Sequence, residues 1–97
     1  MVRYLVLFQF TEQGIKHISE SASRAEGFQK AAQKAGATVK DIYWTVGRYD
    51  GSLVLEATDE TAAMALLTKL GSQGNVRTTT LRAFDRSEME SIVGKMK

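Results

Sequence analysis

Alternating side chains near the N-terminus predict a β-strand over residues 2–10. Both faces of this strand are largely apolar, whereas a strand with one face in water would alternate more cleanly between apolar and polar residues. We therefore expect other parts of the structure to cover both sides of it. The positions on one face are Tyr4, Val6, Phe8 and Phe10, and those on the other are Leu5, Leu7 and Gln9.

Helical spacing replaces the alternation after residue 10. Thr11 is a suitable N-cap, and small apolar residues then recur every three or four positions until Gly36 provides a stop. These features predict one helix, in which Gly14 and Gly27 are candidate points of close packing or of a bend. Asp59 is likewise a suitable N-cap for a second helix, which is expected to end near Gly71.

The remaining pattern predicts three more strands and a last helix. Strands are expected at residues 38–47, 52–58 and 76–84, with a tight turn at residues 47–51. Asp85 and Glu88 have the spacing of a capping box, which starts the last helix. Met89 and Met96 are interpreted as packing residues of that helix.

The order of the elements predicts the fold. A β-α-β-β-α-β order with a C-terminal helix is typical of an α+β, ferredoxin-like domain, in which two helices cover one face of a four-stranded antiparallel sheet. No linker or repeat interrupts it, so a single domain is expected to span residues 1–97. The other face of the sheet keeps large apolar residues, and a homodimer that packs sheet on sheet is the simplest way to cover them.

The amino-acid composition limits which classes of protein and which kinds of functional site are expected. The chain has 97 residues, 43% hydrophobic and 25% charged, which is typical of one globular domain. Its apolar runs are far shorter than the roughly 20 residues of a membrane span. Cysteine is absent and histidine occurs once, so no metal motif is present, and no cofactor motif is found. The first strand lacks a signal-peptide cleavage site, so we expect a cytoplasmic protein.

The charge pattern favours solvated helix faces over a nucleic-acid site. The net charge is only +2, and acids pair with bases four residues apart, as in Glu12/Lys16 and Glu26/Lys30. Arg77 and Arg82 on the fourth predicted strand could bind an anion. Because charged residues also protect edge strands from aggregation, edge protection is the favoured interpretation.

The string Gly47-Arg48-Tyr49-Asp50 matches the motif G-x-Y-D and resembles the GYD domain family. Residues 11–14, the segment around Arg24 and residues 74–84 also resemble the family pattern, in the same order. The resemblance implies a ferredoxin-like domain of the dimeric α/β-barrel type, a group that includes isomerases, cofactor-free oxygenases and haem proteins. It implies no settled activity.

His17 and Arg24 are candidate functional residues on the first predicted helix. Both fall at the border of its apolar stripe, where a side chain can reach the rim of a cavity between helix and sheet. His17 could act as a general base, and Arg24 could anchor a carboxylate or phosphate. The alternative is an exposed histidine beside an arginine whose stem packs on apolar surface.

Further candidates lie on the second predicted strand and on the turn. Tyr43 and Thr45 share one face, and with Tyr4 and Thr78 or Thr80 they could line a cavity of mixed polarity. Trp44 is expected in the core beneath the helices. Plain β-propensity is the favoured interpretation of the tyrosines and threonines.

The turn residues Tyr49 and Asp50 are candidates for ligand or oligomer contact. Asp50 beside Gly51 also suits a turn sterically, without any ligand.

Two functions are consistent with these residues. The favoured hypothesis is a homo-oligomer that binds a small effector, anionic or carbonyl in nature, or that serves in assembly, without nucleic acid or membrane. The alternative is a cofactor-free enzyme that moves a proton in the cavity, with His17 or Tyr43 as the catalytic residue.

Overall fold

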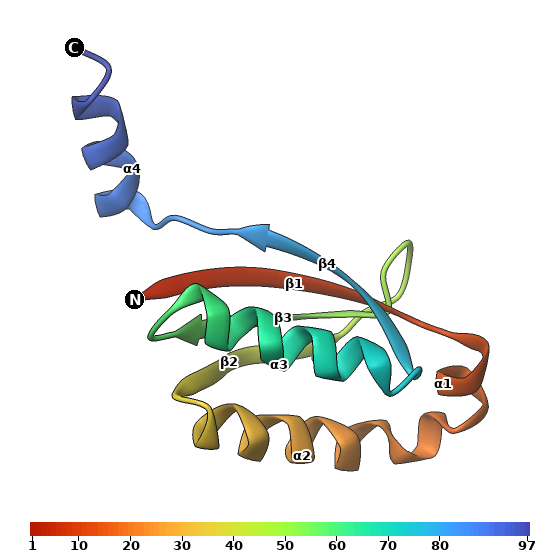
Figure 1. The fold of residues 1–97 in the computed structure, drawn as a ribbon. Coiled ribbons are helices and arrows are strands. Elements are labelled where there is room, and N and C mark those ends of the chain that lie inside the picture. The colour runs from red at the N-terminus through yellow and green to blue at the C-terminus, as the bar shows by residue number, and fades with distance from the viewer.

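The computed structural model describes residues 1–97 as two layers, a four-stranded antiparallel sheet and a pair of helices on one of its faces (Figure 1). The strands lie in the order β2-β3-β1-β4, so the first strand pairs with the third and the fourth. This order and the helices on one face confirm the predicted α+β, ferredoxin-like fold. The elements are β1 (Val2–Phe10), α1 (Glu12–Lys16), the 3₁₀ turn η1 (Ile18–Glu20), α2 (Ser21–Lys34), β2 (Ala37–Trp44), β3 (Gly51–Ala57), α3 (Glu60–Ser72), β4 (Val76–Arg82) and α4 (Arg86–Gly94).

The core lies between the sheet and helices α2 and α3. Val6 of β1 and Leu55 of β3 are the largest side chains that are completely buried. Ala32 of α2 and Ala63 of α3 are also fully buried, and their small side chains let both helices approach the sheet closely. The core therefore combines large residues on the strands with small residues on the helices. It consists of Tyr4, Val6, Ala32, Ala37, Leu53, Leu55, Ala57, Ala63, Leu66 and Leu67.

The predicted first helix is broken, which corrects the expectation of one helix from residue 11 to residue 36. His17 lies between α1 and η1 with φ −113° and ψ 33°, outside helical geometry. The hydroxyl of Thr11 accepts a hydrogen bond from the Gly14 amide (3.1 Å) and donates one to the carbonyl of Gly74 (2.5 Å). The first turn is thus tied to the loop before β4, whereas α2 must lie along the sheet, so the chain changes direction between them.

Strand β2 contains a β-bulge at Asp41, which has a positive φ of 37°. Before the bulge, Val39 lies opposite the buried Leu55, on the side of the helices. After it, Tyr43 lies opposite Ser52, on the side that no helix covers. We call this second side the open face of the sheet.

Helix α4 projects away from the rest of the domain on the side of the open face (Figure 1). The expected capping box is confirmed, because the side chain of Asp85 accepts from the Glu88 amide and that of Glu88 accepts from the Asp85 amide. The packing expected of its methionines is not found within the chain, since Met89 and Met96 are both exposed. No helix of the chain has the length and apolar character needed to cross a membrane.

Candidate ligand-binding site

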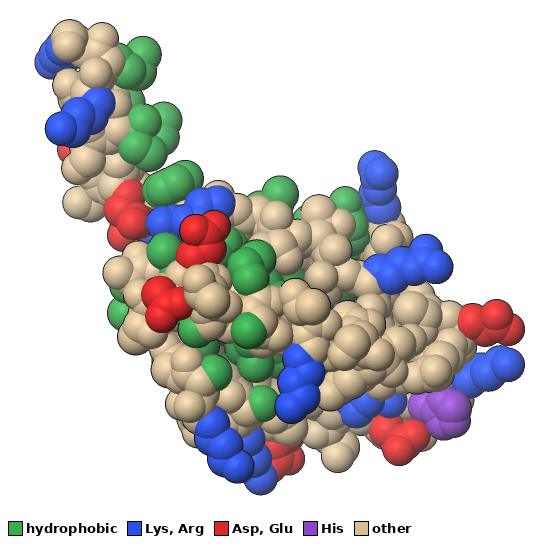
Figure 2. All heavy atoms as spheres, in the orientation of Figure 1, with side chains coloured by type: hydrophobic (Ala, Val, Ile, Leu, Met, Phe, Trp, Pro, Cys, Tyr) green, Lys and Arg blue, Asp and Glu red, His purple; other side chains and the backbone are tan.

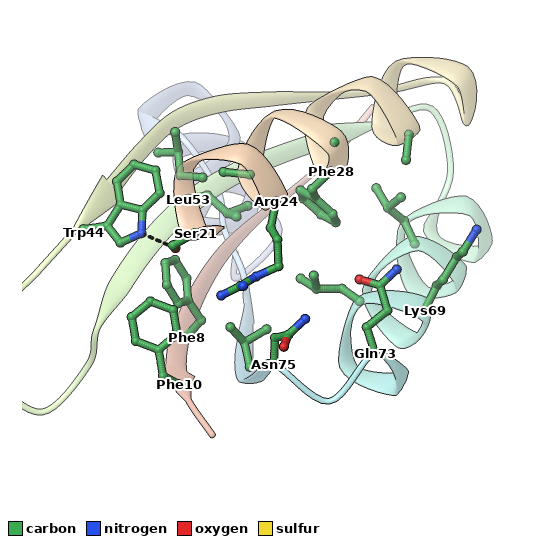
Figure 3. A pocket seen from close by; sticks show the side chains of 17 residues that line it. Phe8, Phe10, Ser21, Arg24, Phe28, Trp44, Leu53, Lys69, Gln73 and Asn75 are labelled. Carbon is green, nitrogen blue, oxygen red and sulfur yellow. Dashed lines mark hydrogen bonds between the residues drawn. The ribbon is translucent and has the colours of Figure 1, made fainter. Parts of the chain in front are cut away.

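A cavity of about 340 Å³ lies between the sheet and helices α2 and α3, at the end of the sheet where the β2–β3 hairpin turns (Figure 3). It is within the range of small-molecule sites, and most of its lining is apolar, as is usual for such sites. Its lining residues come from β1, α2, β2, β3, α3 and the start of β4. They are Phe8, Phe10, Ser21, Arg24, Ala25, Gly27, Phe28, Ala31, Ile42, Trp44, Leu53, Leu66, Lys69, Leu70, Gln73, Asn75 and Val76.

Aromatic rings form one wall of the cavity. Phe8 and Phe10 project from the same face of β1 and meet edge to face, with 5.9 Å between their ring centroids. The indole nitrogen of Trp44 donates a hydrogen bond to the hydroxyl of Ser21 on α2 (2.9 Å), which fixes the ring against the helix. Trp44 therefore lies at the half-exposed edge of the cavity rather than in the core where we expected it.

Arg24 brings a positive charge to this apolar space. Its Nη1 atom donates to the carbonyl oxygen of His17 (3.0 Å), at the break between α1 and α2. Its Nη2 atom is buried and has no hydrogen-bond partner within the protein. Figure 3 shows the side chain extending from α2 into the cavity, toward Phe8 and Asn75. A buried donor on a cation is costly to leave unpaired, so this atom is suited to an anionic acceptor from a ligand.

Polar groups from the end of α3 and the following loop complete the lining opposite α2. Lys69, Gln73 and Asn75 contribute an ammonium and two amide side chains. The amide nitrogen of Gln13 donates to the Asn75 side chain (2.9 Å) and to the Gln73 carbonyl (3.1 Å), which ties α1 to this loop. The break after α1 thus helps to position the polar side of the cavity.

The β2–β3 hairpin, residues 45–50, borders the same end of the sheet. The carboxylate of Asp50 accepts a hydrogen bond from the Phe10 amide (2.8 Å), and the Asp50 amide donates to the Phe8 carbonyl (2.8 Å). Asp50 therefore ties the hairpin to β1, beside the two phenylalanines of the cavity wall. Thr45 donates through its hydroxyl to the Tyr49 carbonyl (2.6 Å), which closes the turn from within.

The family of the chain follows from a comparison with family models, in which the model described as GYD domain matches residues 4–93. The chain belongs to the GYD domain family. Its GYD domain is also similar in fold to the crystal structure of TTHA0845 from Thermus thermophilus, with a TM-score of 0.54 and 23% identity over 88% of this chain and 95% of that chain. At that identity, the likeness shows the shared fold alone. No curated protein matches the chain.

Within this GYD domain, the cavity includes Arg24 but neither candidate for proton transfer. His17 is exposed, with its Nδ1 atom 3.0 Å from the carbonyl oxygen of Gln13, and its backbone carbonyl accepts a hydrogen bond from Arg24. Tyr43 is 60% exposed on the open face. Thr45, Tyr49 and Asp50 are placed in the hairpin and do not line the cavity.

The expectation that Tyr43 and Tyr4 line one cavity is wrong. Tyr4 is buried on the side of the helices, where Thr78 and Thr80 also point because they lie opposite Phe8 and Val6. The sheet itself therefore separates these residues from Tyr43. Since both faces of β1 are apolar, the alternation alone could not show which face the helices cover.

The arginines of β4 also lie on opposite faces of the GYD sheet. Arg77 is opposite Gln9, on the open face, whereas Arg82 is opposite the buried Tyr4. The Arg82 guanidinium lies over the ring of Phe84, 4.6 Å from its centroid, and donates to the Ala83 carbonyl (2.8 Å). The two arginines cannot share one anion within a chain, and β4 is an edge strand as edge protection requires.

Several lining residues are not predicted by the sequence reasoning. The sequence does contain a sign that Phe8 and Phe10 line a cavity. Two large rings on one strand face oppose a helix stripe of mostly small residues, which leaves space between strand and helix. Gln73 and Asn75 carry none, since a polar loop looks the same whether or not it borders a cavity. No group of three or more potential metal-ligating side chains occurs in the structure.

Proposed function

We propose that the protein is a homo-oligomer that binds a small anionic molecule with an apolar body in the cavity between the sheet and helices α2 and α3. The observation that carries this proposal is the buried, unpartnered Nη2 atom of Arg24 in a cavity with aromatic walls. A guanidinium pairs best with a carboxylate or a phosphate, whose oxygens match its planar geometry. The rings of Phe8, Phe10 and Phe28 favour an aromatic or aliphatic body.

Binding is preferred to catalysis because of where the side chains lie. His17 and Tyr43, the residues suggested for proton transfer, do not line the cavity. A general base must come within hydrogen-bonding reach of the proton that it removes. The cavity instead offers Arg24, Lys69 and two amide side chains, which bind and orient a ligand. The cytoplasmic location stays a prediction.

Replacing Arg24 with glutamine is expected to remove the preference for an anionic ligand. We would measure binding of 1-naphthoate and of its neutral carboxamide by isothermal titration calorimetry. The unaltered protein should bind naphthoate more tightly, and Arg24→Gln should weaken naphthoate about tenfold to a hundredfold, the cost of one charged hydrogen bond. Binding of the carboxamide should change little.

Lys34→Gln provides the matched control, because it removes a cation from the exposed end of α2, away from the cavity. Thermal melting of both variants checks that the fold is kept, since Arg24 also bonds the His17 carbonyl. Equal affinity of Arg24→Gln and of the unaltered protein for naphthoate would refute the proposed anion site.

The open face of the sheet supports the homo-oligomer. Leu5, Leu7 and Val54 are only half-buried there, and Leu81 and Tyr43 are exposed. Contiguous apolar surface of this kind is typical of a contact with another protein. A second copy offers the same surface, and a twofold arrangement covers both at once.

Replacing Leu81 with lysine on this face is expected to convert a dimer into monomers. The added charge would lie beside Leu5 within an apolar contact, where leaving it unpaired raises the dimer dissociation constant about a hundredfold or more. Sedimentation velocity over a range of concentrations would measure this constant. Thr68→Lys on the outer side of α3 is the control and should stay dimeric. A protein that sediments as a monomer before any substitution would contradict the dimer.

A further inference from the structure

Helix α4 carries an apolar stripe that nothing in its own chain covers. Its members project into the space above the open face, and Figure 2 shows hydrophobic side chains gathered on that side of the helix. An amphipathic helix normally buries such a stripe against a partner. The residues of this α4 stripe are Met89, Ile92, Val93 and Met96, between 40% and 80% exposed.

The helix is nevertheless held firmly at its base. The guanidinium of Arg3 forms ion pairs with Glu88 (2.7 Å) and Glu56 (3.0 Å) and lies 3.7 Å from Asp85. Hydrogen bonds from the Asp85 amide and from Arg3 lower the pKa of Glu88, so these contacts favour its charged form. The direction of α4 is thus fixed by the first strand of the sheet, and its stripe is presented rather than left on a loose tail.

The β2–β3 hairpin rises on the same side of the sheet, at the opposite end (Figure 1). The strand register separates the two ends, because Arg82 beside α4 lies opposite Tyr4, whereas Gly51 beside the hairpin lies opposite Phe8. Val46 at this hairpin is fully exposed. The open face therefore has a projecting apolar element at each end, helix α4 at one end and the β2–β3 hairpin at the other.

Two projections at opposite ends match a particular twofold arrangement. When two sheets face each other, a twofold axis that crosses the strands brings α4 of one copy to the hairpin of the other. An axis along the strands would instead bring like ends together. It would place the cations of the hairpin end, Arg48 and Arg77, against their own copies, whereas the carboxylates of the α4 end already lie within ion-pairing distance of Arg3. Repulsion between like charges therefore favours the axis that crosses the strands.

The area of the open face also indicates that α4 and the hairpin take part in the contact between two copies. Four strands of seven to nine residues cover about 500 Å² per copy at the usual strand spacings. A stable dimer of standard size buries about 800 Å² on each partner. The sheet alone falls short of that area, and a contact between α4 and the hairpin at both ends supplies apolar surface to make up the difference.

From these observations we propose that α4 of one copy docks on the β2–β3 hairpin of a second copy, with the α4 stripe packed against Val46 and Tyr43. The proposal rests on the dimer of the proposed function and adds its geometry. Each chain contributes one helix and one hairpin, so the dimer has two such contacts, and the twofold axis crosses the strands.

Cross-linking tests the arrangement cleanly because the chain has no cysteine. The variants Val46→Cys and Ile92→Cys would be prepared separately, mixed to allow exchange of subunits, and treated with a short bis-maleimide. A covalent dimer is expected from the mixture and not from either variant alone. A mixture of Thr68→Cys with Ile92→Cys, which places one thiol on the outer side of α3, is the control and should stay uncoupled.

The outcomes separate this proposal from the dimer on which it rests. Strong coupling of Ile92→Cys alone would show that the two α4 helices meet, and would overturn the arrangement while keeping the dimer. If the protein sediments as a dimer but the mixed cysteine variants do not cross-link, the proposed arrangement is overturned as well. A monomer in sedimentation would refute the dimer itself.

A second variant measures how much α4 contributes to the affinity between the two copies. Ile92→Asp places a charge in the α4 stripe and should raise the dimer dissociation constant about tenfold to a hundredfold. Ser91→Asp, on the polar side of the same helix, is the matched control and should leave the constant unchanged. An unchanged constant for Ile92→Asp would overturn the role of α4.

Discussion

Replacing Gly51 with alanine is expected to destabilise the protein by about 3 kcal/mol or more, one of the two largest effects that we foresee. A β-carbon at this position would overlap the ring of Phe8 and come within 2.5 Å of the Tyr43 carbonyl oxygen. The carbonyl belongs to the paired strand β2 and cannot move without opening the hairpin. For a domain of this size, the midpoint of thermal unfolding should fall by about 12 °C or more.

Denaturant titration at a fixed protein concentration would measure this loss. Gly71→Ala is a suitable control, since a β-carbon there meets nothing within 4 Å and the residue lies in helix α3. A free energy of unfolding for Gly51→Ala within about 0.5 kcal/mol of the unaltered protein, the usual size of a surface effect, would show that the close contact is absent.

Gly14→Ala is the second substitution with a large expected effect. A β-carbon here would fall on the carbonyl oxygen of Asn75, 2.9 Å from its carbonyl carbon, so α1 could no longer pack against the loop before β4. We expect a loss of about 2–3 kcal/mol. The same shift would displace Asn75 from the lining of the cavity, so affinity for an anionic probe should fall as well.

Gly27→Ala is the matched control on the next helix. A β-carbon at Gly27 meets nothing within 4 Å, and alanine is the better helix former, so this variant should be more stable by about 0.5–1 kcal/mol. Circular dichroism during thermal unfolding would compare the two. The midpoint of thermal unfolding is expected to fall for Gly14→Ala and to rise for Gly27→Ala. A Gly14→Ala variant that is more stable than the unaltered protein would contradict the contact with Asn75.

Local signals in the sequence predict most of the fold. The strand at residues 2–10 has the bounds that its alternation predicts, and Asp59 and Asp85 cap helices as their side chains allow. These features depend on neighbours within four residues. The order of the elements then limits the topology to few choices, of which the ferredoxin-like arrangement is confirmed.

Features that depend on distant residues could not be predicted in the same way. The break at His17 follows from the contacts of Thr11 and Gly14 with residues 74 and 75, far along the chain, while the helical spacing continues unchanged across it. Gly14 and Gly27 look alike in the sequence of that segment. Only the structure shows that Gly14 is packed against the backbone and that Gly27 is free.

The candidate site is predicted in part. Arg24 stands out at the border of an apolar stripe, and it is the residue that brings charge into the cavity. The sequence groups Tyr43 with the wrong residues, because the faces of β1 are too similar to show which one is covered. The cavity itself is a volume left between side chains of six elements, and no local pattern encodes such a volume.

The bulge at Asp41 gives the pairing of β2 an unusual importance. One extra residue there sets which side of the sheet receives each later side chain of the strand, so Trp44 borders the cavity and Tyr43 faces outward. Regular pairing of the same residues, without the bulge, would place Tyr43 opposite Gly51 on the side of the helices and turn Trp44 to the open face. The choice between a lined interior and an adhesive exterior therefore depends on how β2 pairs, and not on which residues it contains.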